Sequence, residues 1–229
     1  MMRRGWRTLE IAAVVTDVLD FRGRTPKKLG MDWGDGSIPA LSAVNVRYGS
    51  LDLGRTSHFG SLELYRKWMS KGDTSRGDIL ITTEAPLGNI AQIPDDQAYI
   101  LSQRVILLKP NRDVVDSDFL AQQMSAADFQ AALHGSRSGS TVAGIRQSRL
   151  VALPIQVPSL NEQRRIVAKL EALQTRSRRA RDARRRAAPA RETPPIDPRR
   201  RLPRRPHKRL ARQKQPHRTC PRSPQPHPH

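Results

Sequence analysis

Residue types that can catalyse reactions are present in this sequence, but not at the spacings that such chemistry needs. No Asp or Glu is followed two residues later by Lys, so the acid-x-Lys half of a common nuclease site is absent. The sequence also lacks a Gly-x-x-x-x-Gly-Lys-Ser/Thr phosphate loop, a His-Glu-x-x-His zinc motif and the Asn/Asp-Pro-Pro-Tyr/Phe motif of methyltransferases. We therefore expect no catalytic residue in this chain.

Metal-ligating residues are equally scattered. His58 and His134 are isolated, and the other four of the six histidines lie near the C-terminus without metal-ligand spacing. The single cysteine, Cys220, excludes an internal disulfide framework and fits a reducing compartment. We expect no metal site and no cofactor in this chain.

Basic and hydroxyl side chains in polar segments suit a different chemistry, the reading of double-stranded DNA. Such reading needs cations on the phosphates and hydrogen-bonding side chains on the base edges. For each candidate, an ordinary solvated surface residue is the competing interpretation. The predicted DNA-binding residues are Arg55, Thr56, Ser57, Lys67, Lys71, Arg76, Thr82, Thr83, Arg137, Ser138, Ser140 and Thr141.

Short strands and a few helices must position these side chains. The sequence predicts a strand at 79–83 with a hairpin partner at 90–93, and a further strand at 100–109 whose apolar centre is buried. It predicts one helix at 115–133, capped by Asp116 or Ser117, and another at 61–70. The apolar face of the helix at 61–70 is predicted to consist of Leu62, Tyr65 and Met69. The expected fold class is mixed α/β (α+β), with short twisted strands and flanking helices.

A strongly signalled helix follows this domain. Pro158 precedes Ser159, and Ser159 and Glu162 have the spacing of a capping box. An apolar stripe then follows at three- and four-residue steps, which is typical of an amphipathic helix. Two interpretations of the stripe stay open: it packs on its own domain, or it docks on a partner. The predicted docking residues are Ile166, Val167, Leu170 and Leu173.

The strong positive charge of the chain is concentrated at its C-terminal end. Residues 176–229 hold 19 of the 41 Lys and Arg residues but only 3 of the 21 Asp and Glu residues. Of the 18 prolines, 11 lie from residue 189 onward, where large apolar residues are rare. Such a segment cannot bury enough surface to offset its ordering entropy. We expect a recognition domain at 1–157, one long projecting helix at 158–186 and a disordered Arg/Pro-rich tail at 187–229.

An ordered set of motifs resembles a known family. The set comprises Gly139-Ser140-Thr141, a strand at Leu153-Pro154-Ile155, then Pro158-Ser159-Leu160 and Glu162-Gln163-Arg164 followed by Ile166-Val167. It resembles the end of a target-recognition domain and the start of the conserved spacer helix in type I restriction-modification specificity subunits. The resemblance extends from Trp6 to about Ala183. Beyond this point the family continues with a long helix, and we expect that this chain is truncated or frameshifted there.

The resemblance implies a non-catalytic subunit that recognises one half of a split DNA target. It implies partners: methyltransferase and restriction subunits, and a second specificity chain that pairs through the spacer helix. No apolar run approaches the roughly 18 residues that span a membrane. Glu10 and Asp17 interrupt the N-terminal apolar patch, which argues against a signal peptide, so we expect a cytoplasmic protein.

Two other functions stay open at this point. The chain could be a detached recognition domain of a fused restriction-methyltransferase, which the genes beside it would reveal. It could instead bind nucleic acid generally through its basic tail. Removal of residues 186–229 distinguishes this last interpretation from the first. Sequence-specific binding should survive if the chain is a specificity subunit, and all binding should vanish if the chain binds only through its tail.

Overall fold

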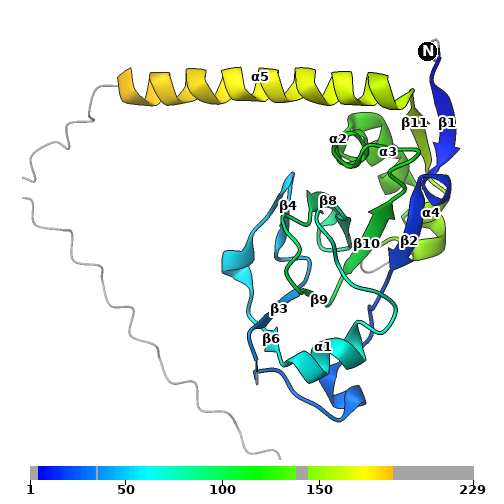
Figure 1. Cartoon of the computed structure of the whole chain (residues 1–229), viewed down its shortest axis with the longest axis vertical. Helices are drawn as coiled ribbons and strands as arrows, with labels where there is room; N and C mark the ends of the chain where they lie inside the picture. The colour runs from blue at the N-terminus through cyan, green and yellow to red at the C-terminus, as the bar shows by residue number, and fades with distance from the viewer. Residues whose placement is uncertain (1–4, 35, 138–143, 188–229) are drawn as a thin grey trace, which may run out of the picture. The chain divides into compact units, whose positions relative to one another are not determined.

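The computed structural model describes residues 5–34, 36–137 and 144–187, with side chains described up to Ala183. Within these residues, the centre of the fold is a four-stranded antiparallel sheet (Figure 1). Its strands, in spatial order, are β2 (Val15–Leu19), β10 (Val105–Pro110), β7 (Ile79–Thr83) and β8 (Leu87–Gln92).

Some predicted features lie outside the described residues. They are the disordered tail from residue 188 onward and three of the predicted DNA-binding residues, Ser138, Ser140 and Thr141. The described residues up to Ala183 belong to one compact unit. The boundary between a recognition domain and a spacer helix at 157/158 stays a prediction.

Both faces of the central sheet are buried. In β7, Ile79 and Ile81 pack in one apolar core, whereas Leu80 packs in the other. The four apolar residues at 105–108 in β10 alternate in the same way, and all are fully buried. Successive strand residues point to opposite faces, so a continuous apolar run identifies a strand that is covered on both sides. The prediction of a buried run here is confirmed.

The first face is covered by helices and by two strands, one from the N-terminal end of the compact unit and one just before the long helix. The N-terminal strand pairs antiparallel with the last strand before the long helix, with Leu9 opposite Ile155. The elements that contribute to this core are β1 (Arg7–Glu10), η1 (Ile11–Ala13), α2 (Ser117–Ser125), α3 (Ala127–Gly135), α4 (Gln147–Val151) and β11 (Pro154–Val157).

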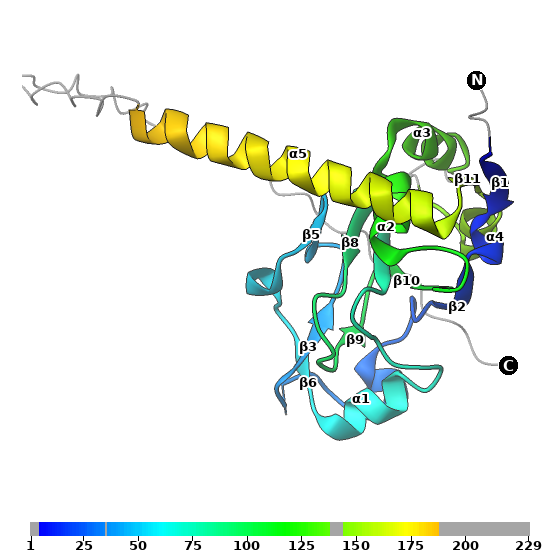
Figure 2. The same ribbon diagram turned by 45° about the horizontal axis from the view of Figure 1, so that its top comes forward.

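The second face is covered by α1 and by small strands. Strand β3 (Ile38–Leu41) pairs antiparallel with β6 (Phe59–Gly60) and parallel with β9 (Ile100–Leu101). Figures 1 and 2 show these strands beside α1, on the side of the sheet away from α2 and α3. The other elements of this layer are η2 (Pro26–Leu29), β4 (Val46–Arg47), β5 (Ser50–Leu51), η3 (Leu53–Arg55) and α1 (Leu62–Trp68).

Two predicted elements are each divided in the structure. The helix predicted at 115–133 is broken at Ala126, which is extended with ψ 153°. The Gln130 side chain donates to the carbonyl of Met124 at 2.8 Å beside this break. The strand predicted at 100–109 is interrupted before β10 by Arg104, whose φ of +65° leaves the extended region. Asp116 caps α2 as predicted, accepting from the amides of Asp118 and Phe119.

The buried face of α1 differs from the prediction at its first residue. Leu64 and Trp68 are buried, and the Trp68 indole donates to the carbonyl of Leu101 at 2.8 Å. Leu62 is instead 54% exposed. Ser61 caps the helix, so Leu62 lies in its first turn on the solvent side, while residues 64 and 68 lie one turn apart on the core side. The prediction for Met69, which is buried, is confirmed.

The long helix α5 (Leu160–Ala187) begins where the sequence predicts. The Ser159 hydroxyl accepts from the amide of Glu162 at 3.4 Å, which is one half of the expected capping box. The Glu162 carboxylate pairs instead with Arg165, at 2.8 Å. Figures 1 and 2 both show α5 leaving the body after its first turns. The mixed α/β fold class is confirmed.

Candidate nucleic-acid interface

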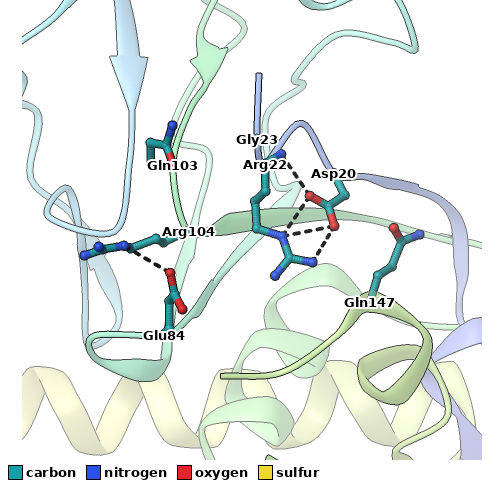
Figure 3. Close-up of a pocket in the computed structure, with 7 residues that line it drawn as sticks. All are labelled: Asp20, Arg22, Gly23, Glu84, Gln103, Arg104 and Gln147. Atoms are coloured by element: carbon teal, nitrogen blue, oxygen red, sulfur yellow. Dashed lines mark hydrogen bonds and ion pairs between the residues drawn. The ribbon is translucent and has the colours of Figure 1, made fainter. Parts of the chain in front are cut away.

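A polar pocket of about 460 Å³ lies at one end of the central sheet (Figure 3). Strands β2 and β7 end there, and β8 and β10 begin there, so the loops at this end converge. Helix α4 adds its first residue. The lining residues are Asp20, Arg22, Gly23, Glu84, Gln103, Arg104 and Gln147.

Arg22 is fixed on all sides of its guanidinium group. Its Nε donates to Asp20 Oδ1 at 2.9 Å, and its Nη2 donates to Asp20 Oδ2 at 2.6 Å. Its Nη1 donates to the carbonyl of Ile145 at 3.2 Å, across 123 residues of sequence. This bidentate pair is largely buried, with 29% of the arginine side chain and 16% of the aspartate side chain exposed. Arg22 therefore ties the residues just before α4, at Ile145, to the end of β2.

Arg104 is held more loosely. Its Nε lies 3.1 Å from Glu84 Oε1, and its side chain is 53% exposed. The left-handed backbone of Arg104 is stabilised by the Thr83 amide, which donates to the Arg104 carbonyl at 2.9 Å. Figure 3 shows Arg104 and Glu84 facing each other across the pocket from different loops. The backbone is therefore fixed, while much of the guanidinium group stays open to solvent.

Both flanks of the segment 138–143 are attached beside this pocket. On one side, Arg149 Nη1 of α4 donates to the carbonyl of Ser136 at 3.2 Å. On the other side, the Ile145 amide donates to the carbonyl of Thr83 at 3.0 Å, and Gly144 lies against Thr83 and Glu84. The predicted DNA-binding residue Arg137 is exposed on the first flank. The predicted loop is thus anchored at the same sheet end as the pocket.

The three candidates at 55–57 have different surroundings. Arg55 ends η3 and pairs with Asp52, with Nε 3.0 Å from Oδ2. The Thr56 hydroxyl accepts from the Asn45 side-chain amide at 3.1 Å, so Thr56 already has a structural contact with another loop. Ser57 is exposed. Of these, Arg55 and Ser57 are open to a ligand.

The basic candidates Lys67, Lys71 and Arg76 are all exposed but do not line the pocket. Lys67 on α1 lies 2.7 Å from Glu63, and its ammonium lowers the pKa of the Glu63 carboxyl through a hydrogen bond and its charge. Arg76 precedes β7, at the sheet end opposite the pocket, because the pocket lies beyond Thr83 at the end of that strand. The sequence candidates therefore lie at both ends of the sheet.

Thr82 and Thr83, which the sequence predicts to bind DNA from an exposed segment, are buried, so the expected exposure is wrong. Their exposed fractions are 0% and 1%. The Thr82 hydroxyl accepts from the amide of Asn89 at 2.9 Å. The Thr83 hydroxyl has no hydrogen-bond partner among the described residues. Both residues lie within β7, whose two faces are covered, so neither side chain can reach a base.

The pocket itself was missed by sequence reasoning. Gln103 and Arg104 precede an apolar strand, and Glu84 follows another, which places them at strand ends. The order of the strands decides that these ends are neighbours, and β7 pairs with β10 only in the folded chain. A turn signal alone could not join them to Asp20 or Gln147.

The predicted docking stripe on α5 divides into two parts. Ile166 and Val167 are half-buried against the core of their own domain, which favours the first of the two interpretations for this part of the stripe. A docking role for them stays a prediction. Leu173 is 53% exposed, and with the half-buried Leu170 it lines a shallow hollow of about 310 Å³. The rest of that hollow is formed by Gln174, Ser177, Arg178 and Arg181.

Neither a membrane-spanning helix nor a metal-binding cluster is found among the residues that the structure describes. No described helix is both long enough and apolar enough to cross a membrane. The same residues contain no group of three or more His, Cys, Asp or Glu side chains that could hold a metal ion.

Solved structures share this fold. An HsdS subunit from Thermoanaerobacter tengcongensis superposes with a TM-score of 0.59 at 24% identity, over 81% of this chain and 46% of that chain. A chain from a structure of type I R-M complex assembly and conformational transition gives a TM-score of 0.59 at 19% identity, over 82% and 43%. This chain thus spans less than half the length of either relative.

Sequence comparison identifies the family. No curated protein matches the chain. The family described as "Type I restriction modification DNA specificity domain" matches residues 5–181, which include the central sheet, the pocket and most of α5. The chain therefore belongs to the family of type I restriction-modification DNA specificity domains.

Proposed function

We propose that this chain recognises one half of a split DNA target as a specificity subunit, or part of one, in a type I restriction-modification complex. The observation that carries the proposal is the family match over residues 5–181. Exposed basic residues supply candidate phosphate contacts that position DNA. The exposed basic residues that the sequence predicts as DNA-binding, within the described part of the chain, are Arg55, Lys67, Lys71, Arg76 and Arg137.

In the proposed complex, this chain supplies recognition and its partners supply the chemistry. A methyltransferase subunit brings S-adenosylmethionine and the adenine-methylating site, and a restriction subunit brings ATP-driven translocation and cleavage. The chain acts where the DNA is, in the cytoplasm. The sequence supports this division, because the catalytic motifs sought in it are absent.

We also propose that the distal part of α5 binds the equivalent helix of a second specificity chain. Beyond Leu170, every described residue of α5 is exposed up to Ala183, so this helix buries no apolar face on its own domain there. Leu173 on an otherwise polar helix is the kind of position that a second helix covers. The occupant is a second specificity helix, since the exposed stripe continues the helix that the family match covers up to residue 181.

A methylation map of the genome tests the proposed function. Adenine methylation is sequenced in cells with the gene and in cells from which the gene is deleted. We expect one split motif to lose methylation on deletion and to regain it when the full chain is restored. An unchanged map in a strain whose methyltransferase subunit is expressed would refute the proposal.

A further inference from the structure

The two arginines of the pocket differ in how much of their hydrogen-bonding capacity is used. Arg22 donates from Nε, Nη1 and Nη2 to Asp20 and Ile145. Arg104 is fixed only at Nε, by Glu84. The outer edge of the Arg104 guanidinium group, with both terminal nitrogens, therefore remains available to a ligand. When a carboxylate orients one edge of a guanidinium group, the N–H groups of the other edge also point in a fixed direction. These paired donors form a fork that can bind two acceptors at once.

Two amide side chains lie beside this fork. Gln103 and Gln147 line the pocket, and neither side chain has a hydrogen-bond partner among the described residues. Each carboxamide offers both a donor and an acceptor. Gln103 precedes Arg104 directly, and its backbone is fixed because the Ala43 amide donates to its carbonyl at 3.2 Å.

The charge of the pocket argues against a phosphate ligand. Its two arginines are matched by Asp20 and Glu84, so the charges of the lining cancel. Exposed arginines lie nearby instead: Arg137 on one flank of the segment 138–143, and Arg146 on the other, one residue before α4. Neither has an ion-pair partner within the described ranges. In a DNA groove, the base edges lie between two negatively charged phosphate backbones. A pocket without net charge that has exposed arginines on both sides therefore suits base edges in the pocket and phosphates on the arginines.

We propose that this pocket reads base edges in the major groove of the DNA target, an inference that rests on the proposed function. Arg104 donates through its free edge to a guanine, and Gln103 and Gln147 bond the edges of neighbouring bases, of which adenine fits a glutamine best. Arg22 and Asp20 hold the pocket in shape. Glu84 is a positioning residue that sets the direction of the Arg104 fork.

The test uses the full chain expressed together with the methyltransferase subunit of its own system, and the methylated adenines are sequenced. Arg104→Lys keeps the positive charge but removes the fork. We expect this variant to lose discrimination at one G·C position of the motif by about 5- to 150-fold, as for loss of one bidentate contact. Gln103→Ala should relax a neighbouring position. Glu84→Gln should weaken discrimination at the same position as Arg104→Lys.

Matched controls separate reading from folding and from charge. Arg66→Lys makes the same exchange at an exposed position on α1, and it should leave the motif and its discrimination unchanged. Arg137→Ala should weaken binding of all sequences alike and reduce the salt dependence of binding. Thermal unfolding of each purified full-length variant shows whether the chain still folds.

The outcomes distinguish the two proposals. If the unaltered chain directs methylation to a motif, but Arg104→Lys, Gln103→Ala and Glu84→Gln all keep that motif with undiminished discrimination, the pocket does not read bases and the proposed function stands. If the three variants only lower the thermal midpoint, the pocket is structural. If the unaltered chain directs no methylation, the proposed function fails and the pocket assignment fails with it.

Discussion

The two parts of α5 belong to one continuous helix but have opposite surroundings. In the first part, Gln163 is fully buried, and Ile166 and Val167 pack on the core of the recognition unit. In the second part, from residue 171 to residue 183, every side chain is exposed. The helix itself is thus continuous, whereas burial ends after Leu170 and the apolar stripe ends at Leu173.

Gln163 explains where the first part is attached. Its Oε1 accepts from the Asp116 amide at 2.7 Å, and its Nε2 donates to the carbonyls of Val114 and Pro158 at 3.2 and 2.9 Å. Asp116 is also the cap of α2. One buried amide therefore joins the starts of two helices. An amphipathic stripe thus predicts a helix, but only the neighbouring elements decide which part of the stripe is buried in the domain.

The largest effect is expected from a charge in the attached part. Ile166→Asp places a carboxylate against the apolar core on which Ile166 packs. We expect the free energy of unfolding to fall by about 3 kcal/mol, from lost burial and the cost of a half-buried charge. Urea unfolding of the full chain, followed by circular dichroism, measures the change. A loss below about 1 kcal/mol would show that this part of α5 is not attached as described.

Removal of the buried amide should have the next largest effect. Gln163→Ala leaves the Asp116 amide and two carbonyls without their partner, and we expect a loss of about 2 kcal/mol. Gln163→Glu keeps the acceptor for the Asp116 amide but cannot donate while ionised, so it should also destabilise the chain. Gln174→Ala, an exposed change on the same helix, is the control and should alter stability by less than about 0.5 kcal/mol. Equal effects of Gln163→Ala and Gln174→Ala would contradict the attachment.

A smaller effect is expected at the helix start. Ser159→Ala removes the side-chain acceptor for the Glu162 amide, a bond that is long at 3.4 Å. We expect a loss of about 0.5 kcal/mol, at the low end for a cap residue. The same urea experiment measures it, and Ser159→Asp, which restores a cap acceptor, should recover the loss. No recovery would mean that Ser159 acts in another way.

The smallest effect on stability is expected in the exposed part. Leu173→Asp should change the free energy of unfolding by less than about 0.5 kcal/mol, because Leu173 is 53% exposed. It should nevertheless abolish the pairing of specificity helices that we propose. Sedimentation of the full chain over a range of concentrations measures this pairing of specificity chains, and Ser177→Asp, on the same hollow but without loss of an apolar side chain, provides a milder comparison. Normal assembly by Leu173→Asp would remove Leu173 from the docking surface.

The DNA-binding candidates show the same division between local pattern and tertiary position. Arg55, Lys67, Lys71, Arg76 and Arg137 are exposed, as expected for residues that contact DNA, and whether they do so stays a prediction. Thr82 and Thr83 are hydroxyl residues that suit DNA contacts by type, yet both faces of their strand are covered by apolar cores. Composition and turn signals do not show which side of a strand end is covered.

The sequence by itself determined the local elements and the family. The apolar runs of β7 and β10, the Asp116 cap of α2 and the Ser159 start of α5 follow from short-range spacing, because capping and strand alternation depend on residues a few positions apart. The ordered motifs around Pro158 indicated the family that residues 5–181 match. The tertiary structure decided the rest. Arg22 meets Ile145 across 123 residues and Gln163 meets Asp116 across 47, and such contacts arise only when the sheet order brings distant segments together.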